Sequence, residues 1–414
     1  MSVKAAARRL DVLEEMVRAG VADGLALRTP DDVPFDGRTV SLDGRPVLNF
    51  GSCGYLGLEF DSRLQAGVCE AVRRYGTQFS SSRIYLQAPL YAELEQCLGE
   101  MFGGHVLVTP TTTLGHMAAL PVLVGPQDAV IVDQQVHQSV QMALDHLRCQ
   151  GTAITMIPHS DVSRLEAALA QHAGHARIWY LADGVYSMYG DIAPLDQLAA
   201  LLQRDERLHL YIDDSHGVGW AGRYGRGPAL DRLGSHERLV VAAGFAKSFG
   251  TGGAALVFPD AELKSRVRAT GGPMIFSGPV QPPMLGAALA SARIHLSPEL
   301  HDLQRALRER IELCTQLLSQ HGIALAGHDG TPICFVPIGR PALAREVARR
   351  LLEEGFFTNA ATYPAVPLRQ AGVRFMLTLH HRPSDIQHLI AALSRHLSQV
   401  HPAQDNQGQP AEAA

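Results

Sequence analysis

Short apolar runs alternate with stretches of helical periodicity along most of the chain. The apolar runs are too short for helices and predict strands over residues 105–108, 129–132, 153–157, 178–181, 208–212 and 239–243. Strands that alternate with helices in this way are typical of a largely parallel sheet covered by helices on both faces. The pattern therefore predicts an α/β fold, with a large domain over residues 48–288.

A smaller unit is expected over residues 289–400. A long amphipathic helix comes first, and two strands and two further helices follow it. These elements are predicted near residues 300–321, 333–336, 342–354, 375–379 and 385–400. Gly355 suits the end of the middle helix. The second domain is therefore expected to be α+β.

The two ends of the chain differ from the domains. Residues 1–47 form an N-terminal arm with an amphipathic helix near 4–20, whose apolar side is expected to pack on a partner subunit. A helix lying on a membrane surface is the alternative. Residues 401–414 contain too few apolar residues to pack and are expected to be disordered.

Composition narrows the class of protein. The chain has 414 residues, 46% of them hydrophobic, so it can bury a large core in more than one domain. A net charge of −5 argues against a nucleic-acid partner. No apolar run is long enough to span a bilayer and no signal peptide precedes the fold, which predicts a cytoplasmic protein. The six cysteines show no paired spacing, so free thiols are expected and no metal site.

An acid, a histidine and a lysine follow one another between residues 208 and 254. Asp213 comes after the apolar run that ends at Ile212, so it is expected at the carboxyl edge of a buried strand, where open α/β sheets hold ligands. His216 lies three residues later. Lys247 lies directly behind the next predicted strand. Such a lysine can form a Schiff base with a carbonyl cofactor, and a carboxylate can keep a pyridine nitrogen protonated.

Each of these residues has an ordinary explanation when taken alone. An aspartate at a strand end is often a helix cap or a turn residue, and an isolated lysine is nearly always on the surface. The combination favours pyridoxal phosphate chemistry instead. Small residues on both sides of Lys247 leave room for its amine to approach a planar ring.

Several motifs resemble those of a known family. They read LNF at 48–50 with YLGL at 55–58, DGVYSM at 183–188 with GD at 190–191, and DDSHG at 213–217 with GRG at 225–227. On these motifs the chain resembles the α-oxoamine synthases among the fold-type-I pyridoxal phosphate enzymes. The family includes 8-amino-7-oxononanoate synthase, 2-amino-3-ketobutyrate ligase and serine palmitoyltransferase. The resemblance implies that fold, a pyridoxal 5′-phosphate cofactor and a homodimer with shared active sites.

The resemblance also implies residues that hold the cofactor phosphate. Thr112 and Thr113 occupy the family's phosphate-binding place, although the family usually has serine and glycine there. They begin a predicted helix, where free backbone N–H groups favour an anion; an ordinary threonine-rich cap is the alternative. Ser277 matches the serine that reaches the phosphate from the partner subunit. Gly244 and Gly278 replace two hydroxyl residues of the family.

Further residues are expected around the cofactor ring. His137 falls on the family's ring-stacking histidine, for which a core histidine is the alternative. Ser187 and His216 match residues that hydrogen-bond the 3′ oxygen. Asp213 is expected to pair with the ring nitrogen. Lys247 is expected to bind the cofactor first and then to remove the Cα proton.

Three residues are expected to contact the substrates. Arg374 matches the arginine whose planar fork binds the amino-acid carboxylate; a surface arginine on a strand is the alternative. Cys53 and Tyr55 lie in SCGY at 52–55, where the family usually has SNDY. The smaller groups near the acyl substrate favour a role in secondary metabolism or lipid synthesis.

These residues predict an acyltransferase that condenses an amino acid with an acyl thioester of coenzyme A or acyl carrier protein. Decarboxylation would then give an α-amino ketone. The alternatives are a transaminase, a decarboxylase or an autoinducer-synthase-like enzyme on the same fold, and a non-catalytic partner subunit. The joint presence of Lys247, Asp213, His216 and Arg374 argues against the last.

Overall fold

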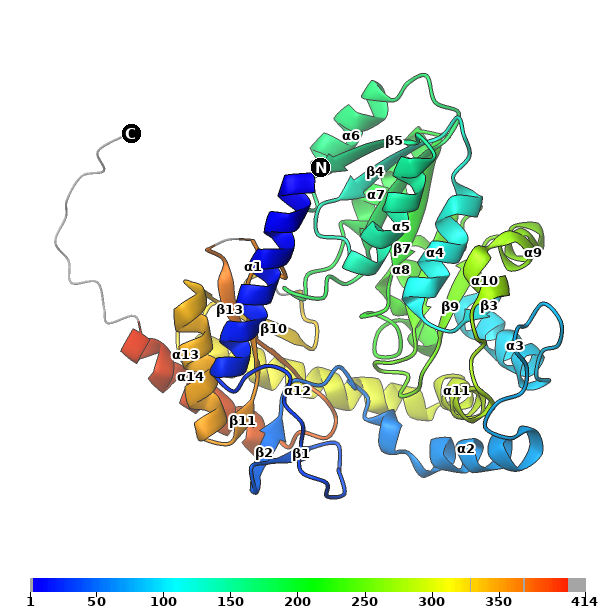
Figure 1. Ribbon diagram of the computed structural model, residues 1–414. Coiled ribbons are helices and arrows are strands. Elements are labelled where there is room, and N and C mark those ends of the chain that lie inside the picture. Colours follow the sequence, from blue (N-terminus) through cyan, green and yellow to red (C-terminus); the bar gives the residue numbers. More distant parts are fainter. Residues whose placement is uncertain (1–2, 328, 368, 401–414) are drawn as a thin grey trace, which may run out of the picture.

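The protein is described here by a computed structural model that covers residues 3–327, 329–367 and 369–400. Within these residues a seven-stranded sheet has the order β3-β9-β8-β7-β6-β4-β5 (Figure 1). β9 pairs antiparallel with both of its neighbours, and the other pairings are parallel. The strands are β3 (His105–Thr109), β4 (Ala129–Asp133), β5 (Ala153–Ile157), β6 (Ile178–Asp183), β7 (Leu208–Asp213), β8 (Leu239–Gly244) and β9 (Ala254–Phe258). The predicted α/β fold is confirmed.

Helices cover both faces of this sheet, which explains why central strands such as β6 and β8 are buried along their whole length. One face packs against α4 (Thr112–Leu123), α5 (Gln138–Cys149) and α9 (Ala261–Thr270). The other packs against α3 (Leu90–Phe102), α6 (Val162–Gln171), α7 (Leu195–Arg204), α8 (Gly227–Leu233) and α11 (Pro282–His295). Short helices link these elements: η1 (Leu58–Phe60), η2 (Arg223–Gly225) and α10 (Gly272–Phe276).

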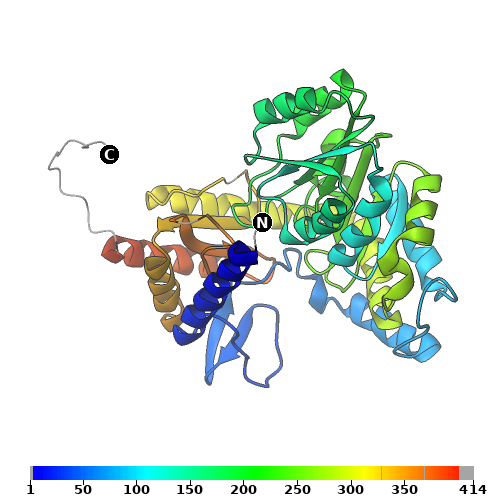
Figure 2. The same ribbon diagram turned by 45° about the horizontal axis from the view of Figure 1, so that its top comes forward.

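A smaller lobe contains the C-terminal elements, as Figures 1 and 2 show. Its antiparallel sheet has the order β10-β13-β12, and a second small sheet has the order β1-β2-β11. The strands are β1 (Thr39–Leu42), β2 (Arg45–Asn49), β10 (Ile333–Gly339), β11 (Phe356–Phe357), β12 (Asn359–Ala361) and β13 (Ala371–Met376). The helices are α12 (Glu299–Gln320), α13 (Pro341–Glu353) and α14 (Pro383–Val400). These elements confirm the expected smaller α+β domain.

The predicted domain boundary at residues 288 and 289 falls inside α11. This helix packs against α2 (Ser62–Tyr75), where the two backbones approach closely at Gly67 and Gly286. A Cβ atom at Gly286 would lie 2.2 Å from the carbonyl oxygen of Gly67, so the contact requires glycine. The helix therefore stays with the large lobe until His295, and the division of the chain into domains stays a prediction.

The N-terminal helix α1 (Val3–Ala22) lies beside the small lobe. Asp23, directly after it, accepts a 2.5 Å hydrogen bond from Nε of Arg345 in α13. Leu10 on this helix is 65% exposed, which leaves apolar surface for another contact. Among the described helices, none combines the length and the apolar character that crossing a bilayer requires. The predicted disordered tail, 401–414, lies outside the described residues.

Candidate active site

Asp213 ends strand β7 and is almost fully buried, with 5% of its surface exposed. Its Oδ1 accepts hydrogen bonds from the backbone N–H of Ser215 at 3.0 Å and from the Ser215 hydroxyl at 2.5 Å. Its Oδ2 lies 3.0 Å from Nε2 of His116, a buried residue of α4. The carboxylate is therefore held on both oxygens at the carboxyl edge of the sheet, as the sequence predicted.

Two neighbouring carboxyl groups have opposite charge preferences. Burial alone would raise the pKa of Asp213, but the hydrogen bond and charge of His116 and the charge of Lys247 outweigh it and hold this pKa below its ordinary value. Asp183 lies opposite Asp213 in the β6–β7 register. Burial raises the pKa of Asp183 well above its usual range, and the negative charge of Asp213 raises it further. Asp213 is thus the ionised member, as a pyridinium partner requires.

Lys247 lies in the tight loop that follows β8. The residue is half-buried, and its charge is close enough to Asp213, Asp183 and His216 to shift their pKa values. Among the described residues, no hydrogen bond or ion pair engages its Nζ atom. Gly250 has φ +75°, and a Cβ atom there would lie 2.7 Å from the backbone nitrogen of Glu59. Glycine at this position lets the loop turn and present the lysine.

The N-terminus of α4 lies next to this loop. Thr111 caps the helix by accepting a hydrogen bond from the N–H of Leu114, so Thr112 and Thr113 supply the first helical N–H groups, which have no partner within a helix. A Cβ atom at Gly244 would lie 3.5 Å from Cγ2 of Thr112 and 2.9 Å from the hydroxyl of Ser215. The donor set, the lysine and the acid thus converge, and they fit pyridoxal phosphate, since a helix N-terminus can bind a phosphate.

The space around Gly244 also explains one departure from the family. The Ser215 hydroxyl, bound to Asp213, occupies the volume that a side chain at position 244 would need. A serine or threonine there would require Ser215 to move. The hydroxyl that the sequence lacks at position 244 is therefore matched by a hydroxyl at position 215.

His216 and Tyr55 form a buried pair. The Tyr55 hydroxyl lies 2.8 Å from Nδ1 of His216. Burial raises the pKa of Tyr55 well above its usual value, so the phenol keeps its proton. Burial also lowers the pKa of His216 well below its ordinary value, and the charges of Lys247 and Arg374 lower it further. A neutral His216 whose Nδ1 accepts a hydrogen bond from the Tyr55 hydroxyl carries its own proton on Nε2 and can donate a hydrogen bond from there to an oxygen.

Arg374 lies on β13 and is 7% exposed. Its Nε donates to the carbonyl oxygen of Ser187 at 2.7 Å, and its Nη2 lies 3.9 Å from Sγ of Cys53. Among the described residues, no carboxylate pairs with this guanidinium. Because the Nε contact fixes the planar group, its two terminal nitrogens remain for a carboxylate. Ser187, Cys53 and Arg374 are thus brought together from three distant segments.

His137 is the N-cap of α5 and is partly open to solvent. Its Nδ1 lies 2.6 Å from the hydroxyl of Ser139, and its backbone N–H donates to Oδ1 of Asp183 at 3.0 Å. Partial burial lowers the pKa of His137, Asp213 opposes this change, and Lys247 adds to it. The ring is therefore held near the lysine and the acid, and it is not the core histidine that the sequence also allowed.

Ser277 is placed apart from these residues. It follows α10, and its hydroxyl donates to the carbonyl oxygen of Pro273 at 2.7 Å. Within the described residues, no hydrogen bond joins it to the lysine loop or to α4. Its expected contact with the cofactor of a partner subunit stays a prediction.

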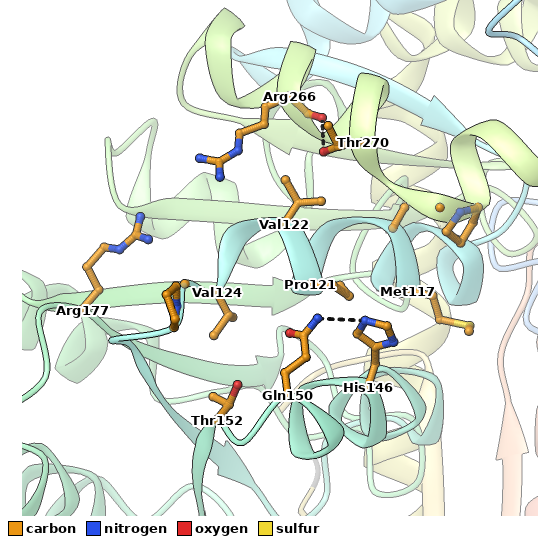
Figure 3. A pocket seen from close by; sticks show the side chains of 15 residues that line it. Met117, Pro121, Val122, Val124, His146, Gln150, Thr152, Arg177, Arg266 and Thr270 are labelled. Carbon is orange, nitrogen blue, oxygen red and sulfur yellow. Dashed lines mark hydrogen bonds between the residues drawn. The ribbon is translucent and has the colours of Figure 1, made fainter.

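Two cavities differ in their relation to this site. A cavity of about 360 Å³ reaches Arg374. Another, of about 790 Å³, lies between α4, α5 and α9 and is shown in Figure 3. There His146 and Gln150 are hydrogen-bonded at 3.0 Å, and Arg266 and Thr270 come from α9. The larger cavity contains none of the predicted site residues, so its size does not make it the catalytic pocket.

Sequence reasoning missed three residues of the site. The sequence alone did not assign His116 to the site, and Asp183 and Ser215 occur only as members of two motifs that resemble the family. The signal available for His116 was a polar residue four positions after Thr112, on the same face of the helix as the residues that approach the sheet. The pairing of Asp183 with Asp213 needed the register of β6 and β7.

Comparisons with known proteins agree with this geometry. Residues 45–393 match the family described as aminotransferase class I and II. The chain is 34% identical to 8-amino-7-oxononanoate synthase of Geobacter sulfurreducens over 367 residues, which covers 87% of this chain and 91% of that protein. It is 31% identical to a putative 8-amino-7-oxononanoate synthase of Desulforudis audaxviator over 395 residues, covering 94% of this chain and all of that protein.

Solved structures share the fold. A serine palmitoyltransferase from S. paucimobilis, solved with pyridoxal phosphate and myriocin bound, superposes with a TM-score of 0.86 at 24% identity and covers 97% of this chain and all of that one. An 8-amino-7-oxononanoate synthase from Francisella tularensis gives a TM-score of 0.72 at 20% identity over 85% of this chain and 98% of that one. The chain therefore belongs to the α-oxoamine synthases, pyridoxal-phosphate-dependent enzymes within the class I and II aminotransferase family.

Proposed function

We propose that this enzyme condenses an amino acid with an acyl thioester and releases an α-amino ketone. The observation that carries the proposal is Arg374, a buried guanidinium with no carboxylate partner among the described residues. A buried charge without a partner is costly, and a substrate carboxylate supplies the missing partner. Its charge acts on His216, as that of Lys247 does, so the carboxylate would be bound beside the lysine.

Each of the other residues has a defined task. Bound pyridoxal phosphate supplies an electron-accepting ring that stabilises negative charge at Cα. Thr112 and Thr113 hold its phosphate, Asp213 holds the proton of its ring nitrogen, and His216 donates to its 3′ oxygen through Nε2. Ser187 takes part through its backbone, because its carbonyl oxygen orients Arg374.

Lys247 is the base that removes the Cα proton of the amino acid. Its Nζ would hold the cofactor, would be released when the substrate amine takes its place, and would then remove the Cα proton. The bond from Cα to the acyl carbonyl carbon forms as the carbon–sulfur bond breaks, and the thiol leaves. The bond from Cα to the carboxylate then breaks, carbon dioxide is released and Cα is reprotonated. His137 and Arg374 orient the Cα substituents so that these bonds break in turn.

The cavity of about 360 Å³ supports an acyl substrate. Arg374 and Met188 lie on its wall, and the apolar residues Leu13, Met16 and Val17 of α1 face them. Its volume lies in the range of ligand pockets, roughly 300–1,000 Å³. An apolar space that adjoins the carboxylate-binding arginine suits a chain attached to the reacting carbonyl.

A homodimer is proposed on a separate surface. The hydroxyl of Ser82 donates to the carbonyl oxygen of Ile275 at 2.6 Å, which joins the loop before α3 to α10. Here Tyr85 is 83% exposed and Phe276 is 87% exposed. Such an apolar patch favours a subunit contact, and Ser277 lies within it. Sedimentation of wild type and of a Tyr85→Asp, Phe276→Asp double variant tests this contact: the variant should be monomeric.

Thiol release tests the reaction. The enzyme loaded with pyridoxal phosphate is first screened with amino acids for a change in its visible spectrum, and acyl thioesters of increasing length are then added while free thiol is measured. Release that requires both substrates supports the proposal. Transfer of the amino group to a 2-oxo acid would favour a transaminase, and carbon dioxide without thiol would favour a decarboxylase. A protein that binds neither cofactor nor amino acid would be a non-catalytic subunit.

A further inference from the structure

Three buried side chains form a chain of hydrogen bonds behind the site. The Tyr211 hydroxyl lies 2.7 Å from Nδ1 of His116, and Nε2 of His116 lies 3.0 Å from Oδ2 of Asp213. Tyr211 and His116 are fully buried. Tyr211 and Asp213 are two residues apart on β7 and so point to the same face of the sheet, where α4 brings His116 between them.

The acceptor capacity of Asp213 fixes where another donor can bind. Each oxygen of a carboxylate has two lone pairs. Oδ1 already accepts two hydrogen bonds from Ser215, whereas Oδ2 accepts one from His116. A further donor, such as the protonated nitrogen of a pyridine ring, therefore has room only at Oδ2, the oxygen that His116 holds.

The charge of Asp213 decides which group donates in its hydrogen bond with His116. Ionised Asp213 only accepts, so Nε2 of His116 carries a proton and donates it. On the other side of the ring, Nδ1 of His116 is hydrogen-bonded to the Tyr211 hydroxyl, whose phenol keeps its proton because burial raises its pKa well above the usual value. Tyr211 thus holds the ring of His116, and His116 fixes the orientation of Asp213.

We propose that His116 is a positioning residue that, with Tyr211 behind it, holds Oδ2 of Asp213 toward the cofactor's ring nitrogen and keeps the carboxylate ionised. The physical reason is the low dielectric of the site. A buried carboxylate without donors would take the proton from the ring nitrogen and form a neutral pair. A donor on Oδ2 stabilises the anion, so the proton stays on the ring.

The test uses the enzyme loaded with pyridoxal phosphate labelled with ¹⁵N in the ring, and it needs no substrate. It is therefore independent of the proposed reaction. The two measurements are the ¹⁵N chemical shift, which reports protonation of the ring nitrogen, and the dissociation constant of the cofactor. The variants are His116→Leu, His116→Gln and Tyr211→Phe.

A matched control is Tyr180→Phe. Tyr180 is a buried tyrosine on the neighbouring strand β6, and it packs in the core on the opposite face of the sheet from Tyr211. The substitution removes the same phenolic oxygen from a similarly buried tyrosine and leaves the hydrogen bonds between Tyr211, His116 and Asp213 in place.

His116→Leu should move the ¹⁵N resonance toward the unprotonated position and raise the dissociation constant about tenfold, which corresponds to ~1.4 kcal/mol. His116→Gln, whose amide can donate to Oδ2, should recover part of both changes. Tyr211→Phe should change both in the same direction but less. Tyr180→Phe should change neither.

A protonated ring nitrogen and a dissociation constant within about twofold of wild type in His116→Leu would overturn the proposal. Equal effects of Tyr211→Phe and Tyr180→Phe would also overturn it, because the effect would then be a general one of core tyrosines. If His116→Leu does not fold, Tyr211→Phe decides the question. An unchanged ¹⁵N shift and an unchanged dissociation constant in Tyr211→Phe would then show that the hydrogen bonds of Tyr211 and His116 do not act on Asp213.

Discussion

The Tyr55 hydroxyl lies 2.8 Å from Nδ1 of His216, although the two residues are 161 positions apart in the sequence. The contact joins the segment before η1 to the loop after β7, and it fixes which nitrogen of His216 carries the proton. A residue expected on sequence grounds to contact the substrate thus contacts the histidine that we propose binds the cofactor. Removing the hydroxyl oxygen of Tyr55 tests whether Tyr55 determines which nitrogen of His216 carries the proton.

Tyr55→Phe should lower kcat about three- to tenfold, since one buried hydrogen bond contributes about 0.5–1.5 kcal/mol. The fold should stay intact because the ring still fills its place in the core. Steady-state kinetics beside Tyr91→Phe provide the comparison, since the only hydrogen bond of the Tyr91 hydroxyl within the described residues is to the carbonyl oxygen of Val280, at 3.3 Å. An unchanged kcat in Tyr55→Phe would show that the tautomer of His216 does not depend on Tyr55.

Lys247→Ala should abolish both covalent attachment of the cofactor and turnover. The sequence contains three lysines, Lys4, Lys247 and Lys264, so the attachment site can be identified directly. Borohydride reduction followed by peptide mass spectrometry should place the cofactor on Lys247 in wild type. Lys264→Ala is the control, because the Lys264 ammonium pairs with Glu95 at 2.8 Å, and it should keep the attachment. Cofactor trapped on another lysine in wild type would contradict the assignment.

The proximity of Asp213 and Lys247 could be predicted from the sequence, because each follows an apolar run and the ends of neighbouring strands lie at one edge of the sheet. The sequence could not identify His116 as a partner of Asp213, since that contact joins residues 97 positions apart and depends on how α4 lies across β7. The contact between Ser215 and Gly244 also depends on the fold and could not be predicted from the sequence. The sequence suggests a lost hydroxyl at position 244, whereas the structure shows that a neighbouring hydroxyl fills the same space.

Arg374→Lys should raise the KM for the amino acid at least about tenfold and leave the KM for the thioester nearly unchanged. An ammonium keeps the charge but cannot make the hydrogen bond to Ser187 and a two-point contact with a carboxylate at once. Arg349→Lys in α13, whose half-exposed guanidinium pairs with Glu346 of the same helix, serves as the control. Similar increases in both KM values would mean that Arg374 supports the structure of the whole site.

The stability of the protein should fall in mild acid, and His295 should account for part of the loss. His295 is fully buried at the end of α11, and burial lowers its pKa to about 4. The ordinary value is about 6.5, so between these values the unfolded chain binds a proton that the folded protein excludes. The free energy of unfolding should therefore fall by about 3 kcal/mol for this group as the pH drops through that window.

His295→Phe should remove this contribution. The new ring can keep the stacking on Phe249, whose centroid lies 4.7 Å from that of the imidazole. Urea unfolding at several pH values between about 7 and 4 gives the slope, so a constant offset from packing does not affect the comparison. Identical slopes in wild type and variant would show that His295 is protonated in the folded protein.

The proposed condensation makes a quantitative demand on its products. An amino acid labelled with ¹³C in its carboxyl group is incubated with an acyl thioester and the loaded enzyme, and thiol, labelled carbon dioxide and α-amino ketone are measured together. The three should form in equal amounts, and none should form with Lys247→Ala. Labelled carbon dioxide without thiol, or thiol without a new ketone, would contradict the proposed reaction of this protein.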